Sequence, residues 1–354
     1  MSEGQKAMSE GQKQNANGVA YQLEPLRGFD GLSTRVQEMP VPGPHQVVVR
    51  VRATSLNRRD IMLMEGTYPM PARPGVVPLV DGVGEVIARG SGVTRAALGD
   101  RVTGTYYVAW NDGPQTQALG QEQYGANHEG WLATYVLLDE DSVVHVPPHL
   151  TDEEAAALTC AGLVAWAALT KPLPVGPADT VLTVGSGPVG LFAIQHATML
   201  GARVISITSS PEKAERLRKL GADEVVNRKQ TPEWEQAVLD LTDGLGVQRV
   251  VDAVGHLTLP KSLAATAYNG DVVLIGAFPA ERGQESADPL GGKYVGLRRI
   301  AVGSRADFES MNRTIAEHGL RPVIDRVYPF EQAVDAYRYF ETGDPFGKVV
   351  ITLP

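Results

Sequence analysis

The sequence predicts an α/β protein in which a doubly wound parallel sheet is joined to a β-rich domain. Two observations support this prediction. The first is a strand, a glycine-rich turn, a helix and a second strand, which follow one another between Val181 and Lys213. The second is a change near residue 150, before which turns and short strands predominate and after which strands alternate with helices. Such alternation indicates a parallel sheet with helices on both faces.

The chain from Val19 to about Leu150 is predicted to be all-β with many turns. Runs rich in β-branched residues predict strands at 47–53, 82–88, 101–104 and 133–138. Between the last two lies the stretch Tyr106–Gly130, which has no clear periodicity and is long for a connection. We therefore expect this stretch to cover the substrate.

The second region is predicted to begin at a helix capping box, in which Thr151 is followed three residues later by Glu154. A helix is expected at 234–242, and strands at 181–184, 203–207, 225–227, 250–254 and 272–276. The chain ends in a strand, Lys348–Thr352, which we expect to rejoin the first domain. The expected organisation is a disordered tail at 1–18, a β-rich catalytic domain at 19–150, a cofactor domain at 151–300 and a return to the catalytic domain at 301–354.

The glycine-rich turn closes the first strand of the cofactor domain and opens its helix with the sequence Gly185-Ser186-Gly187-Pro188-Val189-Gly190. Gly185 permits the tight turn, Gly187 lets the backbone approach a pyrophosphate, and Gly190 lets the helix pack close to the strand. The N–H groups and the dipole of the helix would then face the phosphates. In this context the motif favours a dinucleotide site over a merely structural turn.

Composition and charge exclude several other classes of protein. The 354 residues include 32 basic and 41 acidic side chains and no basic tract, which argues against a nucleic-acid partner. No apolar run reaches the roughly 20 residues of a membrane helix, and the polar first residues lack the apolar core of a secretion signal. The single cysteine, Cys160, excludes an internal disulfide and fits a reducing compartment. We expect a cytoplasmic protein that acts on a small molecule.

Seven short segments beyond the tail have an order and spacing that resembles one family. They are residues 55–60, 78–86, 99–102, 160–163, 185–190, 220–223 and 346–349. Together they resemble the medium-chain dehydrogenase/reductase superfamily, which includes alcohol dehydrogenases and quinone reductases. The resemblance implies a GroES-like β-rich domain, a Rossmann cofactor domain, and hydride transfer to or from a nicotinamide. Homodimers are common among such relatives.

The chain departs from the zinc-dependent members of this superfamily at the metal ligands. Where those members have a cysteine and a His-Glu pair, this chain has Asn57 and Val80-Asp81, and only Cys160 remains at the later position. Catalytic zinc needs three protein ligands. The cysteines of the structural zinc lobe are also absent from Tyr106–Gly130. We therefore expect no metal, and we interpret Cys160 as a small buried apolar residue.

The choice of nicotinamide cofactor depends on the end of the second strand. An NAD site has Asp or Glu there, about 20 residues past the motif, whereas this chain has Thr208, followed by Ser209, Ser210 and Lys213. Arg228, just past the next strand, is expected on the same edge. These hydroxyls and cations could bind the 2′-phosphate of NADPH, and no carboxylate at this strand end would repel it, so the pattern favours NADPH. The alternative is NADH, with Lys213 and Arg228 as solvated surface charges.

The resemblance implies further positions around the nicotinamide and the substrate. Those around the nicotinamide are Val254, Gly255, Ile275, Gly276 and Phe346. Asn57 and Asp60 occupy active-site positions of the resembling enzymes, where Asn57 would orient the substrate or a water and Asp60 has the alternative role of holding a turn. Tyr106 and Tyr107 open the covering loop. Arg58 and Asn111 are weaker candidates for a hydrogen-bond donor near the substrate, and His128 is a weaker candidate for proton transfer.

The leading prediction is an NADPH-dependent, zinc-independent reductase of enones, quinones or similar activated carbonyls. Without zinc, hydrogen-bond donors must polarise the substrate oxygen, while solvent can supply the proton. Two alternatives stay open. One is a metal-free alcohol dehydrogenase, and the other is a nucleotide-binding relative without turnover.

Overall fold

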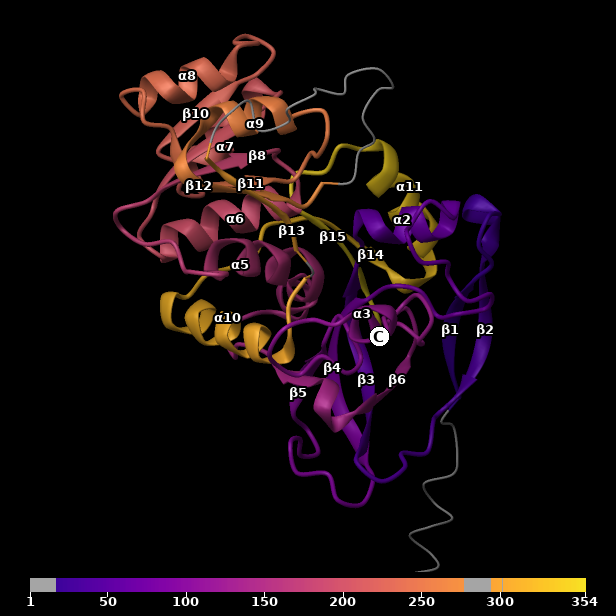
Figure 1. Ribbon diagram of the computed structural model, residues 1–354. Helices are drawn as coiled ribbons and strands as arrows, with labels where there is room; N and C mark the ends of the chain where they lie inside the picture. The colour runs from indigo at the N-terminus through magenta and orange to yellow at the C-terminus, as the bar shows by residue number, and fades with distance from the viewer. Residues whose placement is uncertain (1–16, 277–293, 301) are drawn as a thin grey trace, which may run out of the picture.

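The computed structural model describes residues 17–276, 294–300 and 302–354. In these residues the strands form a two-stranded, a six-stranded and a seven-stranded sheet. Figure 1 shows the six-stranded sheet and its helices at the upper left and the β-rich part of the molecule at the lower right. None of the helices in the described ranges is long and apolar enough to cross a membrane.

The six-stranded sheet is entirely parallel and has the order β10-β9-β8-β11-β12-β13. Its strands are β8 (Thr180–Val184), β9 (Arg203–Thr208), β10 (Glu224–Asn227), β11 (Val247–Asp252), β12 (Thr266–Leu274) and β13 (Gly296–Arg299). In sequence order this is 3-2-1-4-5-6, the order of doubly wound dinucleotide-binding sheets. The predicted fold class is confirmed. The order reverses between β8 and β11, and a ligand crevice is expected at the carboxyl ends of these strands.

Helices cover the parallel sheet, which is why its central strands are largely apolar and buried. Leu182, Ile205 and Val250 are fully buried in the core of this part. These helices are α5 (Leu163–Thr170), α6 (Pro188–Met199), α7 (Pro211–Lys219), α8 (Trp234–Leu241) and α9 (Leu259–Ala265). α10 (Arg305–His318) packs on α5, and α4 (Asp152–Ala155) packs on the seven-stranded sheet. A π-helical turn at Leu158–Gly162 leads into α5. The capping box at α4 is confirmed, since the Glu154 N–H donates to Thr151 Oγ1 at 3.3 Å.

The seven-stranded sheet has the order β14-β15-β3-β4-β5-β7, and β6 pairs with β3. Its strands are β3 (Gln46–Ser55), β4 (Asp81–Arg89), β5 (Arg101–Gly104), β6 (Tyr135–Asp139), β7 (Val143–His145), β14 (Ile324–Pro329) and β15 (Lys348–Thr352). The last strand, β15, pairs antiparallel with β3, so the end of the chain lies beside a strand from its first part. β1 (Asn17–Leu23) and β2 (Leu32–Glu38) form the separate hairpin, and α11 (Ala333–Thr342) packs on β14 and β15.

The all-β prediction for the first region is wrong at one functionally important place. A helix, α2 (Arg58–Glu65), follows β3 directly. Asn57 is its N-cap, the Asp60 carboxylate accepts the Asn57 N–H at 2.8 Å, and Gly66 ends the helix at a φ of +70°. These are ordinary helix start and stop residues. A further short helix, α3 (Gln117–Gln121), lies within the predicted covering loop.

The two large sheets share one hydrophobic core. Its buried members include Val49 and Trp131 from the β-rich part and Leu163 and Leu191 from the helices of the parallel sheet. A polar contact joins β3 to the end of α4, since Ser55 Oγ donates to the Ala156 carbonyl at 2.9 Å. This continuous packing fixes α2 and β15 relative to the parallel sheet.

Candidate functional site

The glycine turn after β8 has the geometry that a pyrophosphate requires. Gly185 has a φ of +105°, which residues with a side chain rarely adopt. A Cβ at Gly190 would overlap the Gly185 carbonyl oxygen. A Cβ at Gly187, the N-cap of α6, would meet no atom within 4 Å. Pro188 takes the first helical position, where its missing N–H costs nothing, and Val189 follows. The space beside Gly187 at the start of α6 is therefore free of atoms of the described residues.

Buried Asp252, at the end of β11, organises the neighbouring strand ends. Its side chain accepts the N–H groups of Val254 and Gly255 at 3.0 and 2.9 Å. Its carbonyl accepts those of Ile275 and Gly276, just past β12, at 2.9 and 3.1 Å. These four residues therefore lie together at one edge of the sheet, as a nicotinamide-binding position requires.

This edge is continuous with the glycine turn. The Ala253 N–H donates to the Val184 carbonyl at 3.0 Å, and a Cβ at Gly185 would lie 3.2 Å from Val254 Cγ2. The ends of β8 and β11 thus form one surface at the point where the strand order reverses.

At the end of β9, the predicted hydroxyl cluster is mostly used by the protein itself. Thr208 Oγ1 donates to Ser186 Oγ at 3.4 Å and accepts the Ser210 N–H at 3.2 Å. Ser210 is the N-cap of α7, and its hydroxyl accepts the Lys213 N–H and donates to the Glu212 carboxylate. Ser209, between them, is partly exposed.

Two cations are placed near this edge. The Arg228 N–H donates to the Thr208 carbonyl at 2.8 Å, and its side chain is exposed. Lys213 Nζ, in contrast, already forms an ion pair with Asp344 Oδ2 at 2.7 Å, and the Asp344 side chain is 83% exposed. A phosphate at Lys213 would therefore compete with a solvated carboxylate.

The segment that leads into β15 connects this edge to the second half of the site. Two residues past Asp344, the buried ring of Phe346 lies 3.7 Å from the guanidinium carbon of Arg216, on α7. Its N–H donates to Asp325 Oδ1 at 3.0 Å. The segment then enters β15 at Lys348, which sequence reasoning had not singled out as a site residue.

Lys348 is the centre of a fully enclosed polar cluster at the start of α2. Its side chain is 1% exposed and Asp81, at the start of β4, is 0% exposed, with 2.9 Å between Nζ and Oδ2. Lys348 Nζ also donates to Asn57 Oδ1 at 2.7 Å and to the Leu56 carbonyl at 2.8 Å. Asp81 Oδ2 accepts a further hydrogen bond from Ser55 at 2.9 Å. In the sequence, the only hint of this arrangement is that Val80-Asp81 occupies the position of the His-Glu pair of the zinc-dependent members.

A second buried cation, Arg59, packs against the rings of two tyrosines. Its guanidinium carbon lies 4.7 Å from the ring centroid of Tyr106 and 5.5 Å from that of Tyr68. It also donates to the Tyr124 carbonyl at 3.0 Å. The hydroxyls of Tyr68 and Tyr106 are 2.9 Å apart. Burial raises the pKa of Tyr106 well above its usual range, so the phenol stays protonated and can donate a hydrogen bond.

Asp60 and Tyr107 border these clusters. Burial raises the pKa of Asp60 to about 6, despite the opposing effect of neighbouring Arg59. The hydrogen bond from the Asn57 N–H supports the turn-holding role for Asp60. Tyr107 packs against Tyr106, with 4.8 Å between ring centroids, and burial also raises its pKa.

The weaker candidates take no part in the hydrogen bonds of the polar cluster around Lys348. Arg58 is exposed, and the imidazole of His128 is paired with Glu122 within the covering loop. The backbone carbonyl of Asn111 accepts the Ala306 N–H. His196 is fully buried, its Nε2 lies 3.2 Å from the Gly162 carbonyl, and burial lowers its pKa to about 4, so it packs as a neutral ring.

At the positions of the zinc ligands, the described side chains either have other partners or carry no ligand atom. The Asn57 amide oxygen and the Asp81 carboxylate are bound to Lys348, and Val80 has no ligand atom. Burial raises the pKa of Cys160 to about 12, which disfavours the thiolate that zinc requires. Within the described ranges, no three His, Cys, Asp or Glu side chains gather as a metal site.

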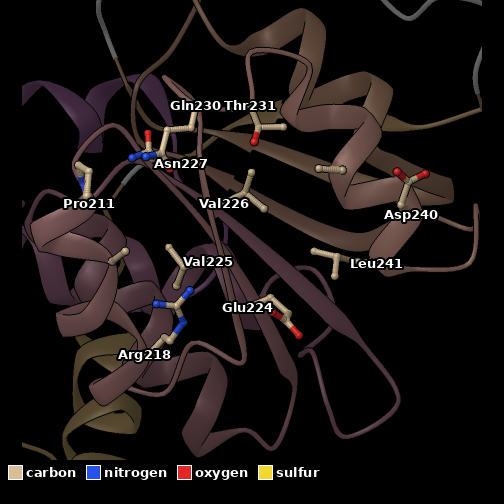
Figure 2. Close-up of a pocket in the computed structure, with 12 residues that line it drawn as sticks. Pro211, Arg218, Glu224, Val225, Val226, Asn227, Gln230, Thr231, Asp240 and Leu241 are labelled. Atoms are coloured by element: carbon tan, nitrogen blue, oxygen red, sulfur yellow. The ribbon is translucent and has the colours of Figure 1, made fainter.

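A separate cavity of about 590 Å³ lies at the outer edge of the parallel sheet. Figure 2 shows residues of β10, such as Val225 and Asn227, with Arg218 of α7 below Val225 and Leu241 of α8 to the right. None of the residues predicted for the cofactor or the substrate lines it.

Two family models match the chain in the order that the fold suggests. Residues 43–148 match the alcohol dehydrogenase GroES-like domain. Residues 188–317 match a domain described as zinc-binding dehydrogenase.

Individual proteins are similar over nearly the whole chain. A zinc-type alcohol dehydrogenase-like protein of Schizosaccharomyces pombe is 35% identical, over 93% of this chain and 97% of its own length. A quinone oxidoreductase of Pseudomonas aeruginosa is 37% identical, over 82% of this chain and 83% of its own. The solved structure of an NAD-dependent alcohol dehydrogenase has a TM-score of 0.86 and 31% identity, and covers 95% of this chain and 100% of its own.

Proposed function

Because the chain belongs to the medium-chain dehydrogenase/reductase superfamily, we propose that it reduces conjugated carbonyls, such as enones or quinones, with NADPH and without zinc. Membership of this family makes the protein an oxidoreductase with a pyridine-nucleotide cofactor. The main support for the finer proposal is the buried cluster of Lys348, Asn57 and Asp81, which takes the place of a zinc ligand set. The 37% identity with a quinone oxidoreductase adds to it.

The residues present fit a pyridine dinucleotide. The N–H groups of α6 after Gly187 would hold the pyrophosphate, and the strand ends at Val254 and Ile275 would hold the nicotinamide. Ser209, Lys213 and Arg228 would hold a 2′-phosphate at the end of β9. When bound, the reduced nicotinamide supplies the hydride.

The chain's own contribution to the reaction is to polarise the substrate oxygen. Asn57 is the first donor that we propose, because its amide nitrogen is buried and has no partner in the described residues. Tyr106, held protonated between Arg59 and Tyr68, is the second. In a conjugated acceptor the negative charge spreads onto the oxygen, where neutral donors can stabilise it. In an enone, the hydride would add to the carbon β to the carbonyl, and solvent would supply the proton to the α-carbon.

The reaction is tested by a substrate panel with the purified protein. NADPH oxidation is measured with quinones, enones, simple ketones and aldehydes, and NADP⁺ reduction is measured with alcohols. We expect conjugated acceptors to be the best substrates and their turnover to persist in a zinc chelator. Efficient turnover of alcohols or unconjugated ketones, with failure of every conjugated acceptor, would establish the alcohol dehydrogenase alternative, and no turnover at all would favour a nucleotide-binding protein.

The cofactor preference is tested at Lys213. Lys213→Ala removes a charge-assisted hydrogen bond to the 2′-phosphate, worth about 1.5–3 kcal/mol, so NADPH affinity should fall roughly ten- to a hundredfold. NADH affinity should barely change. Titration of both cofactors measures the effect, with Lys219→Ala as the control, since Lys219 lies on the same helix and its side chain is 74% exposed. Tighter binding of NADH than of NADPH by the unmodified protein would contradict the proposal and agree with the NAD-dependent relative.

The remaining expectations, a homodimer and a cytoplasmic location, stay predictions. Size-exclusion chromatography with light scattering would test the first of these directly.

A further inference from the structure

The ammonium group of Lys348 has no hydrogen bond left to give. An ammonium has three N–H donors, and the Leu56 carbonyl, Asn57 Oδ1 and Asp81 Oδ2 accept one each, at 2.8, 2.7 and 2.9 Å. The side chain is also sealed from solvent, with 1% of its surface exposed. Lys348 therefore cannot itself contact a substrate, and its effect on one must pass through a neighbour.

That neighbour is Asn57, whose amide has two chemically different ends. With Oδ1 toward Lys348, the amide accepts from a cation, whereas the flipped amide would direct its own N–H groups at the ammonium. The backbone of Asn57 is fixed as well, because its N–H donates to Asp60 Oδ2 at 2.8 Å at the start of α2. The ammonium thus selects one orientation of the amide.

In this orientation the amide nitrogen is left without a partner. Asn57 is 7% exposed, and its Nδ2 is buried with no hydrogen bond to any described residue. A buried donor left unsatisfied destabilises the site, so an oxygen that accepts from it gains free energy. Two cations, Lys348 and Arg59, offset the two carboxylates Asp60 and Asp81 around it, so the local charge does not repel an oxygen that becomes negative.

We propose that Lys348 is a positioning residue, which holds the Asn57 amide so that its N–H donates to the oxygen of the substrate carbonyl. This inference rests on the proposed reduction of a conjugated carbonyl. In this role β15 contributes to the site, because it carries the ammonium group that orients the Asn57 amide at the start of α2.

The first test observes the amide directly and needs no turnover. The side-chain amide resonances of Asn57 are recorded in protein labelled with ¹⁵N-asparagine and assigned by their loss in Asn57→Asp. We expect Lys348→Met to shift this pair, and Lys219→Met, a change on the exposed surface of α7, to leave it unmoved. 2-Cyclohexenone should shift the pair in the unmodified protein and not in Lys348→Met.

The second test is a kinetic cycle with Asn57→Ala. Loss of one well-placed donor to a developing oxyanion lowers kcat by about 10²–10³-fold, and we expect Lys348→Met to cause at least a tenfold loss, with little change in NADPH affinity. In the Asn57→Ala background, Lys348→Met should lower kcat by less than about threefold, because coupled residues are not additive. Lys348→Arg should restore part of the activity.

If Lys348→Met does not fold, the double variant Asp81→Asn/Lys348→Met removes both buried charges and takes its place in both tests. Unmoved Asn57 resonances, or additive losses of kcat, would overturn the positioning role. Failure of every conjugated acceptor with the unmodified protein, while 2-cyclohexenone still shifts its Asn57 pair, would overturn the proposed reaction and leave the hydrogen bond to a carbonyl oxygen established.

Discussion

Asp81→Ala is expected to lower the free energy of unfolding by about 3–5 kcal/mol, because it strands a buried charge. Lys348 Nζ would keep two neutral acceptors and lose the carboxylate that it contacts directly, in a site where both side chains are at most 1% exposed. Ser55 would lose an acceptor as well. Denaturant unfolding, read by circular dichroism, measures the change.

A matched control separates burial from ion pairing as such. Glu215→Ala breaks the exposed pair with Lys219, whose atoms lie 3.6 Å apart on one helix face, and should cost no more than about 0.5 kcal/mol. Asp81→Leu/Lys348→Met should recover a large part of the loss, since buried pairs are often replaceable by apolar side chains. A cost for Asp81→Ala as small as that of Glu215→Ala would mean that the cluster admits water.

The second large effect is expected at Gly187, where binding and stability should separate. Gly187→Asp places a carboxylate at the N-cap of α6, whose extended backbone (φ −83°, ψ 179°) suits it, and no atom within 4 Å opposes the new Cβ. Asp is a favourable N-cap, so stability should be kept or rise by a few tenths of a kcal/mol. The carboxylate would occupy the N–H groups that a pyrophosphate needs and repel its charge, at a cost of several kcal/mol. Cofactor affinity should therefore fall by about a hundredfold or more.

Gly187→Ser is the neutral counterpart, since a serine hydroxyl can accept the same helix N–H groups without a charge. It should bind the cofactor more weakly than the unmodified protein and more tightly than Gly187→Asp. Fluorescence titration with NADPH and thermal unfolding measure the two effects separately. A Gly187→Asp variant that keeps full affinity would show that the dinucleotide does not bind at the start of α6.

The fold class could be predicted because its evidence is local in the chain. The motif at Gly185–Gly190, the β-branched runs and the alternation of strands with helices depend on neighbours within a few residues, and the sheet order β10-β9-β8-β11-β12-β13 agrees with them. Helix α2 was missed although Asn57, Asp60 and Gly66 provide its start and stop. There the apolar positions were interpreted as part of a β-rich region, and the capping residues as active-site positions.

The adenosine end of the site shows the limit of such reasoning. The residue types at Thr208–Lys213 were correctly located at the end of β9, but their partners were not visible. Ser210 caps a helix and Lys213 pairs with Asp344, which is 131 residues away in the chain. Whether a hydroxyl or a cation is free for a ligand depends on such distant partners.

By itself, the sequence determined the superfamily, the parallel sheet and the glycine turn between β8 and α6, because each is encoded in short-range patterns of apolar residues and glycines. Only the tertiary structure decided how the substrate side of the site is built. Lys348 is separated from Asn57 by 291 residues and from Asp81 by 267. No local pattern marks a lysine at the start of a terminal strand as buried. Its burial follows from the pairing of β15 with β3, which brings the ammonium to three acceptors that compensate its lost hydration.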